Sequence, residues 1–179
     1  ATAAARAGAH VTMIAKLGCD FFADIPAKLY EKEGFDTRFV TRTAEHGTGC
    51  ALIEVLTTTG ENRITVVPGA NMAMTREDVY AAEKEISEAA VLLTQRETHP
   101  DSIEAFLELG KKYGKPVVAF SGCVTPDAPR CNAHGIDAFF PILRGISTLE
   151  EALDPENAGR NLFATASQAL RLLKLGKKL

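Results

Sequence analysis

Short apolar runs alternate with amphipathic stretches along most of the chain. Ala90–Thr94 (AVLLT) and Pro116–Phe120 (PVVAF) are apolar at nearly every position, which is typical of parallel strands buried on both faces. Val11–Ala15 is a third strand candidate, and Asp20–Gly34 has the pattern of a helix that ends at glycine. Strands separated by helices of this length predict right-handed βαβ units and a mainly parallel sheet.

Two β-branched runs in the first half predict a β-hairpin. Ala51–Leu56 and Arg63–Val67 flank a turn around Thr59-Gly60-Glu61-Asn62. Downstream, Thr75 and Asp78 have the spacing of a capping box, which predicts a helix that runs to about Ala89. The other predicted elements are helices at Thr2–Ala7, His99–Gly114, Asp127–His134, Thr148–Leu153 and Pro155–Leu173, and a strand at Ile136–Ile142.

The whole pattern predicts one α/β domain over residues 1–179. We expect a three-layer α/β/α, Rossmann-like arrangement with a mainly parallel sheet of roughly five strands and a projecting β-hairpin. The spatial order of the strands does not follow from the sequence.

Composition narrows the class of protein. The chain is 46% hydrophobic and 24% charged, and its net charge of -3 predicts no surface for nucleic acid or anionic membrane. The longest apolar runs fall well short of the roughly 20 residues that a membrane helix needs, and Ala1–Ala9 lacks the features of a signal peptide. Four cysteines without a CxxC pair predict reduced thiols and a cytoplasmic protein.

The sequence carries few motifs of phosphate or metal chemistry. Neither a P-loop nor GxGxxG nor GxSxG occurs. Cys123, Cys131 and His134 have ligand chemistry, but no fourth zinc ligand is evident, so we expect a buried thiol, a surface histidine and no metal. Ser121 and Gly122 follow a predicted strand and precede a predicted helix, where backbone N–H groups bind phosphate or form an ordinary turn.

Residues 1 to about 120 resemble the ribokinase branch of the PfkB-like carbohydrate kinases. The matching segments, in order, are AAARAGAHVTMIAKLGCDFF, EKEGFDTRFV, TGCALIEV, GENRITVVPGAN and LLTQRE. The resemblance implies that the hairpin is part of a β-sheet lid over a sugar, with Ala51, Ile53 and Glu97 at the substrate. The alternative for Glu97 is a solvated loop carboxylate or a partner of Arg96. The resemblance also implies a homodimer through the hairpin at residues 51–67, the alternative being an exposed, mobile hairpin.

Other parts depart from this family. The opening strand with its sugar-binding aspartate, the GGKGAN loop expected before Ala1, and the GAGD anion hole with its catalytic aspartate are missing from the sequence. From about Gly114 to Leu179 the chain looks like the carboxyl end of the glycerate kinases, in GKPVVAFSG and HGIDAFFPILRGISTLEEAL. The sequence therefore reads as a chimera of two kinase fragments joined near the GKPVV run.

Two functional hypotheses follow from this resemblance. The first is a sugar-kinase-like domain that is catalytically incomplete, binds a sugar or phosphate at most weakly and has no evident cofactor. The second is an active kinase for a sugar such as ribose, or for glycerate, which would use ATP and Mg²⁺ in a rearranged site or one shared across a dimer.

Overall fold

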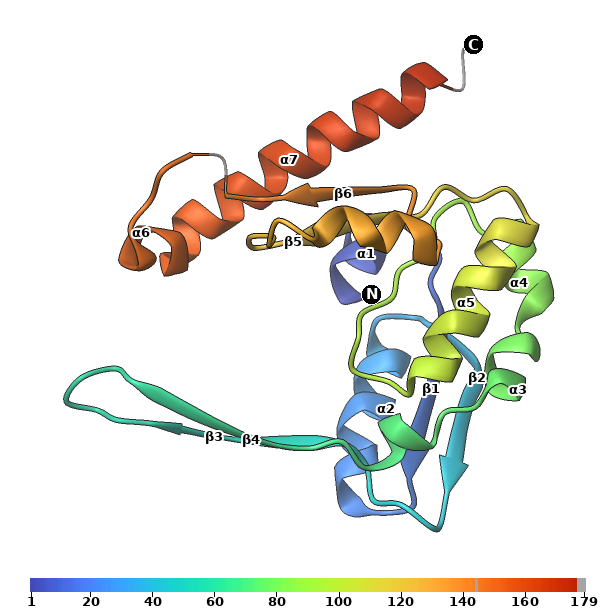
Figure 1. Ribbon diagram of the computed structural model, residues 1–179. Coiled ribbons are helices and arrows are strands. Elements are labelled where there is room, and N and C mark those ends of the chain that lie inside the picture. Colours follow the sequence, from blue (N-terminus) through green and yellow to red (C-terminus); the bar gives the residue numbers. More distant parts are fainter. Residues whose placement is uncertain (144, 177–179) are drawn as a thin grey trace. The chain divides into compact units, whose positions relative to one another are not determined.

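The computed structural model describes residues 1–143 and 145–176, and it divides into two compact units at Lys115/Pro116 (Figure 1). The helices and strands of the first unit are α1 Thr2–Arg6, β1 Thr12–Gly18, η1 Phe21–Ala23, α2 Asp24–Lys32, β2 Asp36–Thr43, β3 Cys50–Val55, β4 Asn62–Val67, η2 Gly69–Ala73, α3 Arg76–Tyr80, α4 Glu83–Glu88 and α5 Pro100–Lys112. Those of the second are β5 Val118–Ser121, η3 Ala128–His134, β6 Ala138–Pro141, α6 Leu149–Leu153 and α7 Pro155–Gly176.

The centre of the first unit is a parallel pair of strands, β1 and β2, connected through α2. Paired residues of parallel strands share a face, so Ile14 and Phe39 lie on one face. Both pack against a buried cluster from η2's end and helices α3, α4 and α5, which consists of Met74, Val79, Ala82, Ile86, Ala105 and Leu109. This cluster is the hydrophobic core of the first unit.

Local sequence signals set several element boundaries. Thr75 and Asp78 form the predicted capping box at the start of α3. Gly135, after η3, adopts a left-handed conformation with φ of 93°, as the glycine stop predicts. Pro155 begins α7 directly after α6, so the predicted break between the two helices is confirmed.

The predicted hairpin forms from β3 and β4, with Ile53 opposite Ile64. It extends away from the rest of the first unit, and all of its strand residues are exposed (Figure 1). The strand β2 was not predicted from the sequence. Both of its faces carry charged or hydroxyl side chains as well as apolar ones, so its residues do not alternate cleanly between apolar and polar.

The predicted central strand at Ala90–Thr94 does not form a strand. No hydrogen-bonded ladder includes it among the described residues, and the side chains of Val91 and Leu93 are 67% and 71% exposed. Leu92 alone of these three packs against the core cluster. An apolar run becomes a strand only where a neighbouring strand pairs with its backbone, which periodicity does not reveal.

The second unit contains the parallel pair β5–β6, in which Phe120 stacks on Phe140 at a centroid distance of 5.7 Å. Its helix α7 follows the capped helix α6. Among the described residues of this unit, Ala169 is the one that is fully buried.

The predicted single sheet differs from the observed topology. The described residues form three two-stranded sheets, β1–β2, β3–β4 and β5–β6, instead of one sheet of about five strands. The α/β class and the parallel pairing are as predicted, whereas the three-layer arrangement remains a prediction. No helix in residues 1–143 and 145–176 has the length and apolar character needed to span a bilayer.

Candidate functional site

The carboxyl ends of β1 and β2 form the edge at which open parallel sheets bind ligands. The two strands end side by side at Gly18 and Thr43. The segment that follows β2 leads into the hairpin, and the segment that follows the hairpin returns to the same edge (Figure 1). Three backbone segments therefore converge there.

The end of β1 is joined to the segment after β2 by two hydrogen bonds. The backbone N–H of Gly18 donates to Thr48 Oγ1 at 2.9 Å, and the backbone N–H of Thr48 donates to Asp20 Oδ2 at 2.6 Å. A Cβ atom on Gly18 would lie 2.5 Å from the nitrogen of Thr48, so a larger residue would force the segments apart. Glycine is required here by this close approach.

The base of the hairpin is packed just as closely. The backbone N–H of Ala70 donates to Gly47 O at 2.8 Å. Gly69 has a φ of 51°, and a Cβ on it would lie 2.3 Å from Gly47 O. A Cβ on Gly49 would lie 2.6 Å from the side-chain Nδ2 of Asn71. These contacts fix the direction in which the hairpin leaves the sheet edge.

Asp20 is the carboxylate at this edge. Its Oδ1 accepts from the backbone N–H of Ala23 at 3.1 Å and caps η1, while its Oδ2 accepts from Thr48. The hydrogen bond from the Thr48 backbone is the main reason that the pKa of Asp20 lies below its ordinary value. Asp20 therefore stays ionised at neutral pH.

The segment that carries Glu97 is attached to the same hairpin base. Glu97 lies in the loop before α5, and the backbone N–H of His99 donates to Asn71 O at 3.2 Å. The carboxylate of Glu97 is exposed and accepts a hydrogen bond from Gln95 Nε2 at 3.1 Å. The alternative partner, Arg96, makes no ion pair with it within the described residues.

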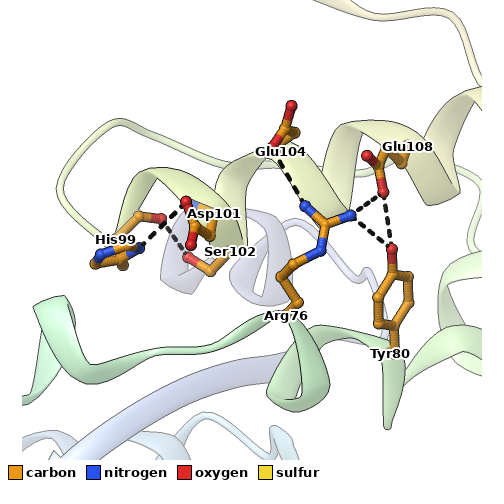
Figure 2. A network of polar contacts seen from close by, with 7 residues as sticks. All are labelled: Arg76, Tyr80, His99, Asp101, Ser102, Glu104 and Glu108. Atoms are coloured by element: carbon orange, nitrogen blue, oxygen red, sulfur yellow. Dashed lines mark hydrogen bonds and ion pairs between the residues drawn. The ribbon is translucent and has the colours of Figure 1, made fainter.

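The start of α5 is held in place by the helix cap that Figure 2 shows. His99 Nδ1 accepts from the backbone N–H of Asp101 at 3.2 Å, and Ser102 Oγ donates to His99 O at 2.7 Å. The imidazole accepts at Nδ1, so this cap requires that nitrogen to be unprotonated. The cap fixes the end of the loop that carries Glu97.

A second set of contacts joins α5 to α3 (Figure 2). Arg76 pairs with Glu104 at 3.2 Å and with Glu108, and the hydroxyl of Tyr80 donates to Glu108 Oε2 at 2.8 Å. These groups are largely exposed, so each ion pair contributes little on its own. Their joint effect is to orient α5 with respect to α3.

The predicted substrate residues on the hairpin share one face. Ala51 and Ile53 are two residues apart on β3, and their cross-strand partners are Val66 and Ile64. This face is wholly apolar from Ala51 to Ile53, whereas the other face carries Glu54 opposite Arg63. The structure thus connects Ala51, Ile53 and Glu97 to one sheet edge through the hairpin base.

Ser121 and Gly122 belong to the second unit, at the carboxyl end of β5. Ser121 Oγ donates to the carbonyl of Cys123 at 2.7 Å, and the following Thr125 donates to Asp127 Oδ1 at 2.5 Å. The helix that follows is a short 3₁₀ helix that begins at Ala128. A carboxylate at its start disfavours an anion, and phosphate binding here stays a prediction.

Asp20, Thr48 and Asn71 were not predicted as site residues from the sequence. The signal for them was present in the glycines beside them, because Gly18, Gly47, Gly49 and Gly69 all lie near these three residues. The four cysteines are free thiols. Among residues 1–143 and 145–176, His, Cys, Asp and Glu side chains form no group of three that could hold a metal ion.

Solved structures define the class of this fold. A structure described as Sa239 matches 90% of this chain and 55% of its own, with a TM-score of 0.68 and 33% identity. Ribokinase from Arabidopsis thaliana, solved in complex with ribose and ATP, matches 90% of this chain and 54% of its own, with a TM-score of 0.64 and 25% identity. The fold is therefore ribokinase-like α/β.

Sequence comparison gives the family. The model of the pfkB family carbohydrate kinases matches residues 1–178, so the chain belongs to this family. Ribokinase from Staphylococcus aureus (strain COL) is 33% identical over 184 residues, covering 99% of this chain and 59% of its own length. The chain thus spans about three fifths of the length of this curated relative.

These matches correct one boundary of the sequence analysis. Both the family model and the Staphylococcus aureus ribokinase extend well past residue 120, where the ribokinase resemblance was expected to end. Glycerate 2-kinase from Escherichia coli is 40% identical over 68 residues, which is 35% of this chain. Membership of the carbohydrate kinase family therefore extends over both units.

Proposed function

We propose that this chain binds a sugar of the ribose class at the carboxyl edge of β1 and β2, beneath the apolar face of the hairpin. The relatives named above include ribokinases, one of them solved with ribose. The proposal rests on one hydrogen bond between the hairpin base and the Glu97 loop, in which the backbone N–H of His99 donates to Asn71 O. This contact links the apolar face of Ala51 and Ile53 to a loop that carries an exposed carboxylate.

Each part of this edge suits a small polyol. Carboxylates such as Asp20 and Glu97 accept hydrogen bonds from sugar hydroxyls, and apolar side chains such as Ile53 cover the C–H faces of the ring. Among the residues that the structure describes, the carboxylate of Glu97 accepts from one side chain, that of Gln95, so its other acceptor sites are available there. We expect Glu97 to bind the sugar directly and Asp20 to hold the edge in shape through Thr48.

We propose further that this chain does not transfer phosphate by itself. GGKGAN and GAGD, the second of which the resemblance assigns to the anion hole with a catalytic aspartate, do not occur in the sequence. Phosphoryl transfer needs groups that position the nucleotide and neutralise developing charge. ATP and Mg²⁺ would be cofactors only in the alternative, an active kinase that completes its site across a dimer.

The second unit supports the proposal of a mixed origin. The unit boundary at Lys115/Pro116 falls within the GKPVV run at which the glycerate-kinase resemblance begins. The glycerate 2-kinase match of 68 residues has nearly the length of residues 114–179. We propose that this segment derives from a glycerate-kinase-like carboxyl end, within the carbohydrate kinase family to which the whole chain belongs. A cytoplasmic location remains part of the proposal.

The hairpin also supports a proposed homodimer. Its outer edges carry backbone N–H and C=O groups that no strand of the described residues pairs, and such edges invite another strand. Leu56 N–H donates to Glu61 O, so pairing alternates along the ladder and the N–H groups of Ile53 and Ile64 point outward. A second copy would add its own hairpin edge to edge and leave the apolar face free for a sugar.

The experiment is a titration of the full chain with D-ribose followed by ¹⁵N NMR, with ATP-dependent phosphorylation of ribose and of glycerate measured on the same sample. We expect millimolar binding that shifts the amides near Thr48, Asn71 and Glu97, and no turnover. Glu97→Gln should weaken binding about tenfold, whereas the matched control Glu88→Gln on α4 should not. Turnover that Glu97→Gln abolishes would establish the kinase alternative, and unchanged spectra would refute sugar binding.

A further inference from the structure

Asn71 lies where the two parts of the proposed sugar site meet. Its backbone carbonyl accepts at 3.2 Å from the backbone N–H of His99, at the end of the Glu97 loop. Its side-chain amide lies against Gly49, directly before β3, where an added Cβ would be 2.6 Å from Nδ2. Asn71 therefore contacts the Glu97 loop through its backbone and the base of the hairpin through its side chain.

The side-chain amide of Asn71 has no hydrogen-bond partner among the residues that the structure describes. Asn71 is half-buried, and every fully buried side-chain nitrogen or oxygen of the described residues has a partner. Neither polar atom of this amide is therefore fully buried, and both are reached by solvent. Such an amide offers two N–H donors and one carbonyl acceptor to a ligand.

The carboxylate of Glu97 lies close to this amide along the chain and across the contact. Glu97 is two residues before His99, so no more than about 7 Å of chain separates it from the hydrogen bond to Asn71. Its partner within the described residues is Gln95 Nε2. An unpaired amide and an exposed carboxylate therefore flank one backbone contact.

Other polar groups of this edge are already engaged. Thr48 Oγ1 accepts from the backbone at the end of β1, and both oxygens of Asp20 accept from backbone N–H groups. These bonds hold the edge together. The side chains of Asn71 and Glu97, in contrast, have hydrogen-bonding capacity left within the part of the chain that the structure describes.

An ionised carboxylate and an amide N–H group make opposite demands on a ligand. The carboxylate only accepts, so its partner must carry a donor hydrogen, whereas Nδ2 only donates, so its partner must be an acceptor. A hydroxyl satisfies either group, and two hydroxyls on neighbouring carbons satisfy both at once. A ligand with one hydroxyl leaves one of the two groups unpaired, which lowers its affinity.

We propose that Asn71 is a specificity-determining residue of this site and that, with Glu97, it selects a sugar ring with two neighbouring hydroxyls over its deoxy analogue. Nδ2 of Asn71 would donate to one hydroxyl oxygen, and the carboxylate of Glu97 would accept from the other hydroxyl. This inference rests on the proposed sugar site. The probe pair is 1,4-anhydroerythritol, a five-membered ring with a cis diol, and 3-hydroxytetrahydrofuran, the same ring with one hydroxyl.

The test is a titration of the full chain with each probe, followed by ¹⁵N NMR. We expect the wild-type chain to bind the diol about tenfold more tightly than the single alcohol, with shifted amides at Asn71 and Glu97. Asn71→Ala should remove most of this preference, because the remaining carboxylate needs one hydroxyl alone, and the nearly isosteric Asn71→Leu should do the same. The matched control is Asn62→Ala on β4, which should keep the preference.

The same spectra separate ligand recognition from a structural role. Both substitutions keep the backbone carbonyl that accepts from His99, and neither touches the hydrogen bond from Ala70 N–H to Gly47 O. The amide signals of His99 and Ala70 should therefore stay near their wild-type positions while the preference is lost. Displacement of these signals in both variants would assign Asn71 a structural role and overturn the inference.

Two further results would overturn it. One is equal affinity of the two probes for the wild-type chain, and the other is a preference that Asn71→Ala and Asn71→Leu leave intact. In either case, binding of D-ribose by the wild-type chain would show that the proposed sugar site stands without this role of Asn71. A wild-type chain that binds neither D-ribose nor either probe would refute the site itself.

Discussion

The backbone N–H of Thr48 donates to the carboxylate of Asp20 at 2.6 Å, and this bond closes the sheet edge beside β1. Because it lowers the pKa of Asp20 in the folded chain, it contributes stability above the ordinary aspartate pKa of about 3.9. That contribution is lost as the pH falls through the lowered value. The hydrogen bond and the acid sensitivity of the edge are therefore linked.

Asp20→Asn should make the first unit less stable at pH 7 and flatten its acid response. The asparagine carries no charge to titrate, so the difference in urea midpoint between wild type and variant should shrink from pH 7 to pH 3. Asp24→Asn, one turn later on α2, is the matched control and should retain the wild-type acid response. A wild-type-like midpoint for Asp20→Asn at every pH would contradict this prediction.

Asp78→Ala should destabilise the first unit by about 1–3 kcal/mol. Asp78 accepts from the backbone N–H of Thr75 in the capping box at 2.8 Å and pairs with Lys16 Nζ at 2.6 Å, and both partners in this pair are 14% exposed. Its loss leaves the Lys16 ammonium without its partner in a poorly solvated place. Urea unfolding measures the change, and the neighbouring Glu77→Ala serves as the comparison. Equal effects of the two substitutions would argue against a special role for Asp78.

Ile86→Ala should lower the unfolding free energy by about 2–5 kcal/mol. Ile86 is 2% exposed and lies in the buried cluster of α3, α4 and α5, so the substitution leaves a cavity. Ile64→Ala, on the hairpin, removes the same atoms from a side chain that is 54% exposed and should change stability by no more than about 0.5 kcal/mol. A large effect of Ile64→Ala would show that the hairpin is covered in solution, as it would be in a tight dimer.

Ile64→Pro should shift the chain toward the monomer if the proposed edge-to-edge dimer forms. Proline removes the N–H of Ile64, which points away from the β3–β4 ladder and is available to a second hairpin. Ile64→Val keeps that N–H and should keep the dimer. Size-exclusion chromatography with light scattering distinguishes the two states. A wild-type chain that is monomeric at all concentrations would rule out the dimer.

The second unit should exchange its amide hydrogens faster than the core helices of the first. Its described residues bury Ala169 alone, whereas Leu109 on α5 is 3% exposed within a continuous core. Local opening of β5, β6 and α7 then exposes little additional apolar surface and costs less free energy. Hydrogen exchange read by mass spectrometry should show the amides of Val118–Ser121 exchanging before those of Pro100–Lys112. The reverse order would show that the second unit is stabilised by contacts beyond its own core.

Local chemistry made much of the fold predictable. The capping box of Thr75 and Asp78, the turn between β3 and β4, and the proline that separates α6 from α7 depend on neighbouring residues, so the sequence indicates them directly. Hydrophobic periodicity did not correctly predict the segments whose conformation depends on pairing with another strand. Ala90–Thr94 has the apolar run of a central strand but no partner within the described residues, and β2 was missed because its strand character comes from pairing with β1.

The sequence by itself determined the α/β class, the hairpin and the family resemblance, because each depends on residue types at short spacing. The tertiary structure decided which distant residues meet. It brought the backbone N–H of Thr48 into a hydrogen bond with Asp20 and the carbonyl of Asn71 into a hydrogen bond with the end of the Glu97 loop. It also left a cavity between α2 and the sheet. These hydrogen bonds join residues that are far apart in the chain, so the glycines in the sequence indicate a close backbone approach but not which segments meet there.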